Sequence, residues 1–296
     1  VENGTEVINN DNSINLGATY TFNSKWSVSA FVPYIWIDRS SLYEHQGNPS
    51  PTNPIANPGR YHTQSRGFGD ARIIGYLNSI PKYHKGSLIV GVGVKLPTGN
   101  YHVKDYFQKG PEPTPTLLPV DQSIQLGDGG TGVIAEIDFS HLLTGKFFGY
   151  VNGMYMVNPR NTNGVQRSPN LTANIPRSNE MSVPDQYMLR AGARFSSSGI
   201  QASLGGRMEC IPAEDLIGDS DGFRRPGYII SAEPSIFYTT GSHTFGLNVP
   251  IALERNRTQN TIDKERTKIT GTFQQGDAAF ADWLLSVSYA YRFAQR

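Results

Sequence analysis

The sequence predicts an all-β protein, specifically a transmembrane up-and-down antiparallel β-barrel of about 12 strands. Three observations predict this fold. Apolar and polar residues alternate in segments that recur along the chain, short and long connections alternate between these segments, and aromatic residues gather toward the ends of the apolar faces. Strands of outer-membrane barrels show such alternation because one face meets lipid while the other faces the barrel interior.

Composition excludes several other classes of protein. The 296 residues include 26 basic and 25 acidic side chains, a formal charge of +1, so no basic surface suited to nucleic acid is expected. No apolar run reaches the roughly 18 residues that a membrane helix needs. Cys210 stands alone, which rules out a disulfide within the chain and a cysteine-based metal site. The start, "VENGTEVINN", lacks the basic end and apolar stretch of a signal peptide, so an exported protein would be present in its mature form.

Eleven segments have one face that is free of charge from end to end. In chain order, with the short connection that joins each pair, they are 14–22 and 26–36 (NSK), 71–77 and 90–96 (PKYHKG), 133–139 and 147–155 (TGK), 187–195 and 202–210 (SSSG), 228–238 and 245–253 (TTGS), and 283–293. Single-chain bacterial barrels have an even number of strands. We therefore predict a weak twelfth strand in residues 1–8, a turn at "NNDNS" after it, and both chain ends on the periplasmic side.

The connections between these pairs are long and rich in Pro, Asn, Gly and Asp. They run near 39–66, 99–125, 158–184, 212–225 and 256–277. Outer-membrane barrels have short periplasmic turns and long external loops, whereas a Greek-key sandwich has no reason to keep that order. We therefore expect residues 1–296 to form a single barrel domain with these segments as its external loops.

Large aromatic side chains mark the ends of the predicted lipid-facing surface. Trp26 and Trp36 lie ten positions apart on one face, and so do Tyr228 and Tyr238. A tilted strand crosses a bilayer in roughly 9 to 11 residues, and aromatic rings collect at both water interfaces. The predicted lipid-interface aromatics are Trp26, Trp36, Tyr228, Tyr238, Tyr289, Tyr291 and Phe293.

Charged residues fall on the opposite faces of the same strands, which we expect to line the barrel lumen. They comprise six acids and six bases, namely Asp70, Glu136, Asp138, Glu209, Glu233, Glu254, Arg72, Lys95, Arg190, Arg194, Arg207 and Arg292. Equal numbers favour cross-strand ion pairs over a charge-selective pore. These pairs either fill the barrel and hold its wall together or line a narrow polar conduit. Arg190, Arg194 and Arg207 lie on consecutive strands, so we expect acids from neighbouring strands to separate them.

Inward-facing apolar residues accompany these charges. We expect Phe31, Phe148, Tyr150, Met154 and Phe237 to contact a solute in the lumen. Many inward glycines, including Gly17, Gly91, Gly192, Gly205 and Gly246, should leave room beside the charges or permit strong curvature of the wall.

Two neighbouring stretches carry a family resemblance. "GFGDARIIGYLNSI" (67–80) followed by "VGVGVKLPTGN" (90–100) resembles a family of bacterial outer-membrane proteins catalogued as transporters of the meta pathway of phenol degradation. "WSVSAFVPYIW" (26–36), "QLGDGGTGV" (125–133) and "LNVPIALERN" (247–256) agree with that family's pattern, whereas the ending "AQR" after Phe293 departs from barrels that stop on the aromatic residue. The resemblance implies an outer-membrane barrel in a Gram-negative bacterium more firmly than it implies phenol as the substrate.

Other motifs are weaker indications of chemistry. "GDGGTG" (127–132) lacks the Gly-Lys-Ser/Thr ending of a phosphate loop, and "GDSDG" (218–222) lacks the spacing and terminal Glu of a calcium loop. Ser140-His141 and Ser242-His243 invite comparison with outer-membrane phospholipase A, but adjacent strand residues point to opposite faces. We expect no enzyme activity, no cofactor and no metal site.

Two functions fit these expectations. The first is an outer-membrane transport barrel, a narrow channel for small, weakly polar or aromatic molecules, whose partners are outer-membrane lipid and a small-molecule solute. The alternative is a closed structural or assembly barrel whose external loops bind other envelope proteins. Long Pro-rich loops suit either function, because they can fold inward as a gate or project as a docking surface.

Overall fold

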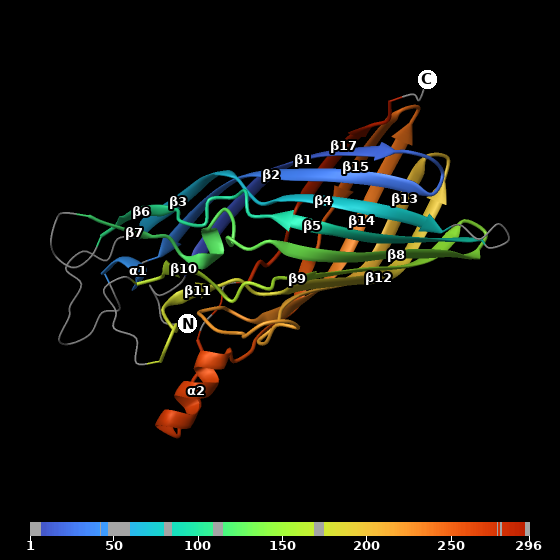
Figure 1. Cartoon of the computed structure of the whole chain (residues 1–296). Coiled ribbons are helices and arrows are strands. Elements are labelled where there is room, and N and C mark those ends of the chain that lie inside the picture. Colours follow the sequence, from blue (N-terminus) through green and yellow to red (C-terminus); the bar gives the residue numbers. More distant parts are fainter. Residues whose placement is uncertain are drawn as a thin grey trace.

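The computed structural model describes residues 7–41, 43–46, 60–79, 85–108, 115–168, 175–276, 278 and 280–293. The chain is nearly all antiparallel β structure and forms one large curled sheet (Figure 1). The strands of this sheet are β1 (Ile8–Thr21), β2 (Trp26–Ser41), β3 (Tyr61–Phe68), β4 (Ala71–Ser79), β5 (Gly86–Leu96), β8 (Gly132–Thr144), β9 (Phe147–Val157), β12 (Gln186–Ser197), β13 (Ile200–Ile211), β14 (Gly227–Thr240), β15 (His243–Asn248), β16 (Ile251–Arg257) and β17 (Ser286–Tyr291).

The order of the strands is that of an up-and-down meander. The path runs β1-β2-β4-β5-β8-β9-β12-β13-β14-β15-β17, with β3 paired to β2 and β16 paired to β14. Each of the eleven segments predicted as strands contains a strand of this sheet. β3 and β4 pair one after the other along β2, and β15 and β16 pair one after the other along β14, so the predicted segment 245–253 is divided between β15 and β16. The sequence pattern predicts these ladders well because alternation over so many residues fits only an extended chain.

Prolines interrupt these two long lines at corresponding places. The amide of Gly69, between β3 and β4, donates to the carbonyl of Pro33, 2.8 Å away. The amide of Val249, between β15 and β16, donates to the carbonyl of Pro234 at 3.1 Å. Pro33 and Pro234 have no amide hydrogen to give to the ladder, so the partner strand breaks opposite each of them.

Among the described residues, short turns lie at one end of the sheet and longer connections at the other, and β3 occupies part of the stretch 39–66 that was expected to be a loop. Between β12 and β13, Ser198 and Gly199 have φ values of 50° and 82°, and Gly241 after β14 has a φ of 58°. Positive φ values in two-residue connections suit the twist of a β-hairpin. At the loop end lie α1 (Tyr43–Gln46), the hairpin of β6 (Lys104–Phe107) and β7 (Thr116–Pro119), η1 (Gln122–Ile124), the pair β10 (Thr162–Gln166) and β11 (Glu180–Ser182), and α2 (Thr261–Thr270).

Two predictions at the start of the chain need correction. "NNDNS" is not a turn, because Asn9 to Ser13 belong to β1 and pair with Ile35 to Arg39 of β2. The polar side chains are accommodated there because β2 extends to Ser41 and Arg39 donates from Nη1 to Asn9 Oδ1 at 2.9 Å. The predicted strand in residues 1–8 falls mostly on residues 1–6, outside the described ranges, and Ile8 already belongs to β1.

The first and last strands run in the same direction, which places the start of β1 and the end of β17 at opposite ends of the sheet (Figure 1). The two termini, residues 1–6 and 294–296, lie outside the described residues, so the placement of both on one side stays a prediction. β1 and β17 form no ladder with each other in the described part of the chain, so they are the two edge strands of the curled sheet. We call the gap between these two edges the seam. All of β17 and residues 10–21 of β1 are exposed on both faces.

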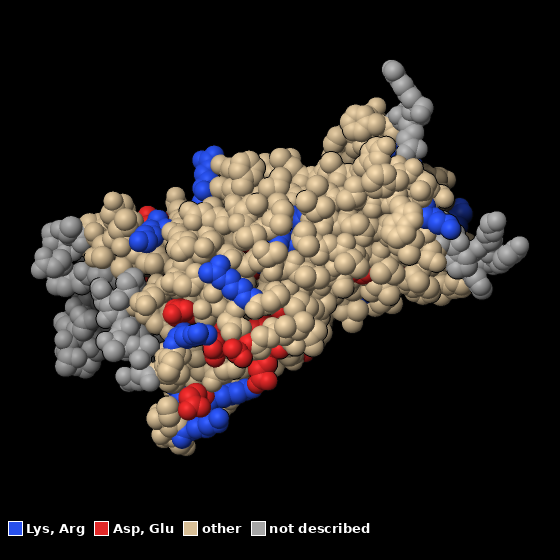
Figure 2. All heavy atoms as spheres, viewed as in Figure 1, with Lys and Arg blue, Asp and Glu red and all other residues tan. Residues whose placement is uncertain are grey.

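The convex face of the sheet is apolar and exposed. Large side chains such as Leu16, Val92, Ile137, Leu204 and Leu247 are each at least 40% exposed there. Most of the surface over the sheet in Figure 2 is free of charged side chains, whereas acids gather over the loops near α2. No helix in the described ranges is long and apolar enough to cross a membrane.

Candidate functional site

The concave face of the sheet carries the candidate site, which begins with a charged cluster on β12, β13 and β14. Arg190 and Arg207 are direct cross-strand partners, so their positive charges lie side by side. Glu233 separates them, accepting from Arg190 Nη2 at 2.6 Å and from Arg207 Nη1 at 3.2 Å, while Glu209 accepts from Arg207 Nη2 at 2.5 Å. Glu233 is only 3% exposed, so its interaction with both guanidiniums is shielded from water.

Arg194 and Asp138 lie beyond this cluster, toward the turn end. The guanidinium of Arg194 lies over the ring of Phe148, 5.7 Å from its centre. No carboxylate lies within ion-pair distance of Arg194 in the described ranges, but its charge interacts with that of Asp138, one of the acids expected near it. A cation over an aromatic face is still favourable.

A second charged cluster joins β5 to the loop before β8. Lys95 is 2% exposed and contacts the carboxylate of Asp128, with Asp70 3.8 Å away. Asp70 also accepts the amides of Gly99 at 2.9 Å and Asp128 at 3.3 Å. Asp70 and Asp128, from "GFGD" and "GDGGTG", thus hold the two ends of this loop together.

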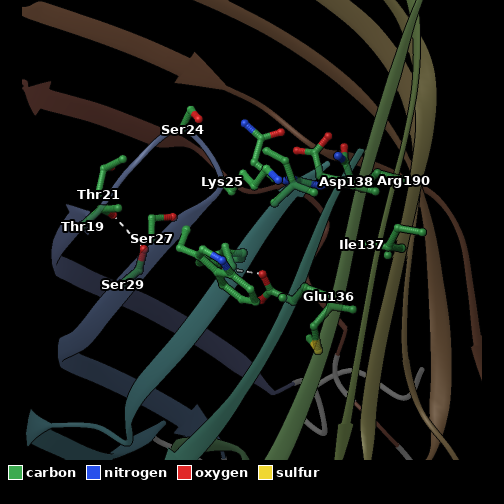
Figure 3. A pocket seen from close by; sticks show the side chains of 18 of the residues that line it. Thr19, Thr21, Ser24, Lys25, Ser27, Ser29, Glu136, Ile137, Asp138 and Arg190 are labelled. Carbon is green, nitrogen blue, oxygen red and sulfur yellow. Dashed lines mark hydrogen bonds between the residues drawn. The ribbon is translucent and has the colours of Figure 1, made fainter. Parts of the chain in front are cut away.

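Two cavities lie in series along the concave face. One, of about 560 Å³, lies at the turn end beside Ser24, Lys25 and Asp138 (Figure 3). The other, of about 740 Å³, lies toward the loop end. Tyr76 and Glu136 line both cavities, and the Tyr76 hydroxyl donates to Glu136 Oε2 at 2.9 Å. This hydrogen-bonded pair marks the boundary between them.

A loop segment folds inward over the loop-end cavity. Val120 and Ile124 are fully buried against Ile37 of β2. Next to them, Asp121 accepts from Nη1 and Nη2 of Arg225 at 2.8 and 2.7 Å, and Arg39 lies 3.9 Å away. Burial by itself raises the pKa of the Asp121 carboxyl, but Arg225 and Arg39 outweigh it and lower that pKa well below its ordinary value of 3.8. We call residues 120–124 the inward segment.

Aromatic rings fill the space beside the inward glycines. A Cβ on Gly17 would lie 2.7 Å from the ring of Phe31, and one on Gly246 would lie 2.4 Å from the ring of Phe237. The hydroxyl of Tyr150 covers Gly205 in the same way. Neighbouring aromatic side chains pack over these glycines and occupy the space that we expected to be free beside the charges.

The remaining predicted residues take varied positions. Arg72 and Phe31 line the loop-end cavity and Met154 lines the turn-end cavity. Arg292 follows β17 and its backbone amide donates to Ser242. The aromatics at 26, 36, 238, 289, 291 and 293 are exposed.

The placement of Glu254 on the concave face is wrong. Its carboxylate accepts from the hydroxyl of Tyr228 at 2.8 Å, so both side chains lie on the convex face. The reason is a register shift in β16: Ser231 pairs with Ala252 but Ile230 pairs with Glu254, which leaves Leu253 as an extra residue. Such a bulge reverses the faces of all residues that follow it.

Sequence reasoning missed several residues of the site. The inward placement of Tyr76 could have been predicted, because this residue alternates with Gly75 and Leu77 on a predicted strand. The pairing of Asp121 with Arg225 could not have been predicted, because the two residues are 104 positions apart and both lie in irregular segments.

Ser140 and His141 lie on opposite faces of the sheet. Ser140 bonds to Ser87 on one face of the sheet, while His141 stacks with Phe139 on the other. In the described ranges no group of three His, Cys, Asp or Glu side chains is arranged to hold a metal ion. Comparison of the chain with protein-family models and with curated proteins finds no match.

Proposed function

We propose that this protein is an outer-membrane barrel of a Gram-negative bacterium that conducts small, weakly polar or aromatic molecules through a narrow lumen. The convex face supports the membrane location, because exposed apolar side chains recur on nearly every strand of the sheet. Patches of this extent are rarely left in water, whereas a lipid-facing barrel wall requires them.

The proposal includes closure of the seam between β1 and β17. Each backbone amide or carbonyl left unpaired in lipid costs roughly several kcal/mol of free energy, so an open sheet edge is not stable in a bilayer. Closure requires either parallel pairing of these two strands or an added strand between them. An odd strand number is compatible with a stable barrel, as in the mitochondrial channel of about 19 strands.

The observation that carries the transport function is the pair of cavities in series on the concave face. Their volumes, about 560 and 740 Å³, fall in the range of small-molecule sites, roughly 300–1,000 Å³. The charged side chains of the wall neutralise one another in clusters, so the interior does not present one dominant sign of charge. A boundary at Tyr76 and Glu136 suits a solute that moves in steps between two compartments.

One set of observations favours the structural alternative. The inward segment covers the loop end, and exposed apolar side chains, among them Leu216, Ile217, Ile269 and Phe273, lie on the long connections. A closed barrel that binds other envelope proteins through its loops would have both features.

Conductance of the purified protein in planar bilayers tests the proposal. We expect small, intermittent conductance from the native protein and a several-fold increase for Tyr76→Ala, because the variant removes the ring at the boundary of the two cavities. Tyr238→Ala is the matched control, since this tyrosine is exposed on the convex face, and it should leave conductance unchanged. If neither the native protein nor correctly folded Tyr76→Ala conducts, the closed structural barrel is favoured.

A further inference from the structure

The wall of the loop-end cavity combines apolar side chains with polar and charged ones. Its apolar lining includes Phe31, Pro33, Ile35, Ile74 and Met156, and its polar lining includes Asn15, Gln122 and Gln186. These side chains come from opposite parts of the curled sheet and from the inward segment. A solute here would contact both apolar side chains and polar groups.

Most of the charged groups that line this cavity already have partners of opposite charge. Lys95 contacts Asp70 and Asp128. Arg225 is paired with Asp121, and Arg224 with Asp215 at 2.5 Å. Glu136 accepts the hydroxyl of Tyr76.

Arg72 is the exception. It lines the cavity from β4, between Phe31 on β2 and Lys95 on β5, its direct cross-strand partners. Within the described ranges no carboxylate lies within ion-pair distance of its guanidinium, and the charge of the adjacent Lys95 is already balanced by Asp70 and Asp128. Glu136, the acid without a cationic partner, lies beside Tyr76, four residues or about 13 Å further along β4. The lining of the loop-end cavity therefore includes one guanidinium, that of Arg72, with no carboxylate at ion-pair distance in the described ranges, next to apolar side chains.

We propose that the loop-end cavity binds a small amphipathic carboxylate, with its anionic group on Arg72 and its apolar body against Phe31, Ile35 and Ile74. A guanidinium offers two parallel N–H donors that match both oxygens of a carboxylate. In a partly buried site this interaction is stronger than in water, because the dielectric is lower. This proposal rests on the proposed transport function, since it names the class of solute that the lumen accepts.

Calorimetric titration of the purified protein in detergent tests the site separately from transport. The probe is hexanoate, compared with its neutral analogue hexanamide. We expect hexanoate to bind the native protein, and Arg72→Gln to weaken that binding on the order of tenfold or more. Arg72→Lys should retain part of the affinity, because it keeps the charge but loses the paired donors. Added salt should weaken hexanoate binding and leave that of hexanamide unchanged.

The matched control is Arg66→Gln. Arg66 lies on the convex face, where it donates to the Tyr34 hydroxyl at 2.9 Å, and its loss should not change binding. Equal affinity of native protein and Arg72→Gln for hexanoate, equal affinity of the native protein for hexanoate and hexanamide, or no binding of hexanoate to native protein would each overturn the proposed site. Because calorimetry needs no flux across a bilayer, hexanoate binding by a protein that proves silent in the conductance test would refute transport and leave the site standing.

Discussion

At the scale of single residues, neighbouring glycines on one strand have opposite surroundings. Gly205 faces the concave side, where a Cβ would lie 2.3 Å from the Tyr150 hydroxyl and 2.5 Å from the carbonyl oxygen of Ala191. Gly206 faces the convex side, and a Cβ there would meet nothing within 4 Å. The first glycine is required by close approach, whereas the second is not.

This difference predicts opposite outcomes for the same substitution. Gly205→Ala should lower the free energy of unfolding by about 1–3 kcal/mol, because the Ala191 carbonyl is backbone and cannot move away from the added methyl group. Gly206→Ala should be neutral or slightly stabilising, because alanine is less flexible than glycine in the unfolded chain. Urea unfolding of both variants in lipid vesicles measures this. Equal stabilities would contradict the close contacts at Gly205.

At the scale of elements, the three strands β12, β13 and β14 depend on one carboxylate. Glu233 separates two arginines that face each other across a ladder. Glu233→Gln keeps the shape of the side chain but leaves both guanidiniums without their shared counter-charge. We expect it to lower the free energy of unfolding on the order of 3 kcal/mol.

Glu254→Gln is the control for this substitution. Glu254 is exposed on the convex face beside Tyr228, so we expect a change within about 0.5 kcal/mol. Unfolding of both variants under identical conditions provides the comparison. A loss at Glu254 as large as that at Glu233 would show that the cluster contributes no more than an exposed acid.

The sequence predicted elements better than it predicted contacts, for physical reasons. Side chains alternate strictly along a strand, so the faces of Arg190, Arg207 and Glu233 could be assigned from the pattern. The bulge at Leu253 has no such signal, and it moved Glu254 to the other face. "NNDNS" has turn composition, yet pairing with a long neighbouring strand overrides local preference. The inward segment depends on contacts between distant loops, which alternation does not encode.

At the scale of the whole molecule, the inward segment links three distant parts of the chain at the loop end. Asp121 joins Arg39 at the end of β2 to Arg225 before β14. Its pKa is lowered in the folded state, so its contribution to stability is complete above the ordinary carboxyl range. That contribution is lost only as the pH falls below about 4, through the lower pKa of the folded protein.

We therefore expect the loop end to stay covered at neutral and mildly acidic pH. Conductance should remain small from pH 7 to about 4 and rise only under stronger acid. Asp121→Asn should show the higher conductance already at pH 7, because it removes the charge that attracts both arginines. Asp221→Asn, which breaks the exposed pair with Arg177, is the control and should behave like the native protein. A native-like response of Asp121→Asn would exclude Asp121 as the residue that retains the segment.

The meander order also bears on how the chain reaches its final form. Each ladder of the large sheet joins strands that are near one another in the chain, either through a short turn or through one longer connection, so pairing can proceed from neighbour to neighbour. The seam between β1 and β17 differs, since the chain must bring together segments from its two extremes. In the closed barrel proposed above, closure of that seam has the largest entropic barrier, and we infer that it completes folding. The rate of refolding into micelles should therefore respond most strongly to substitutions on β1 and β17, although few side chains there are buried.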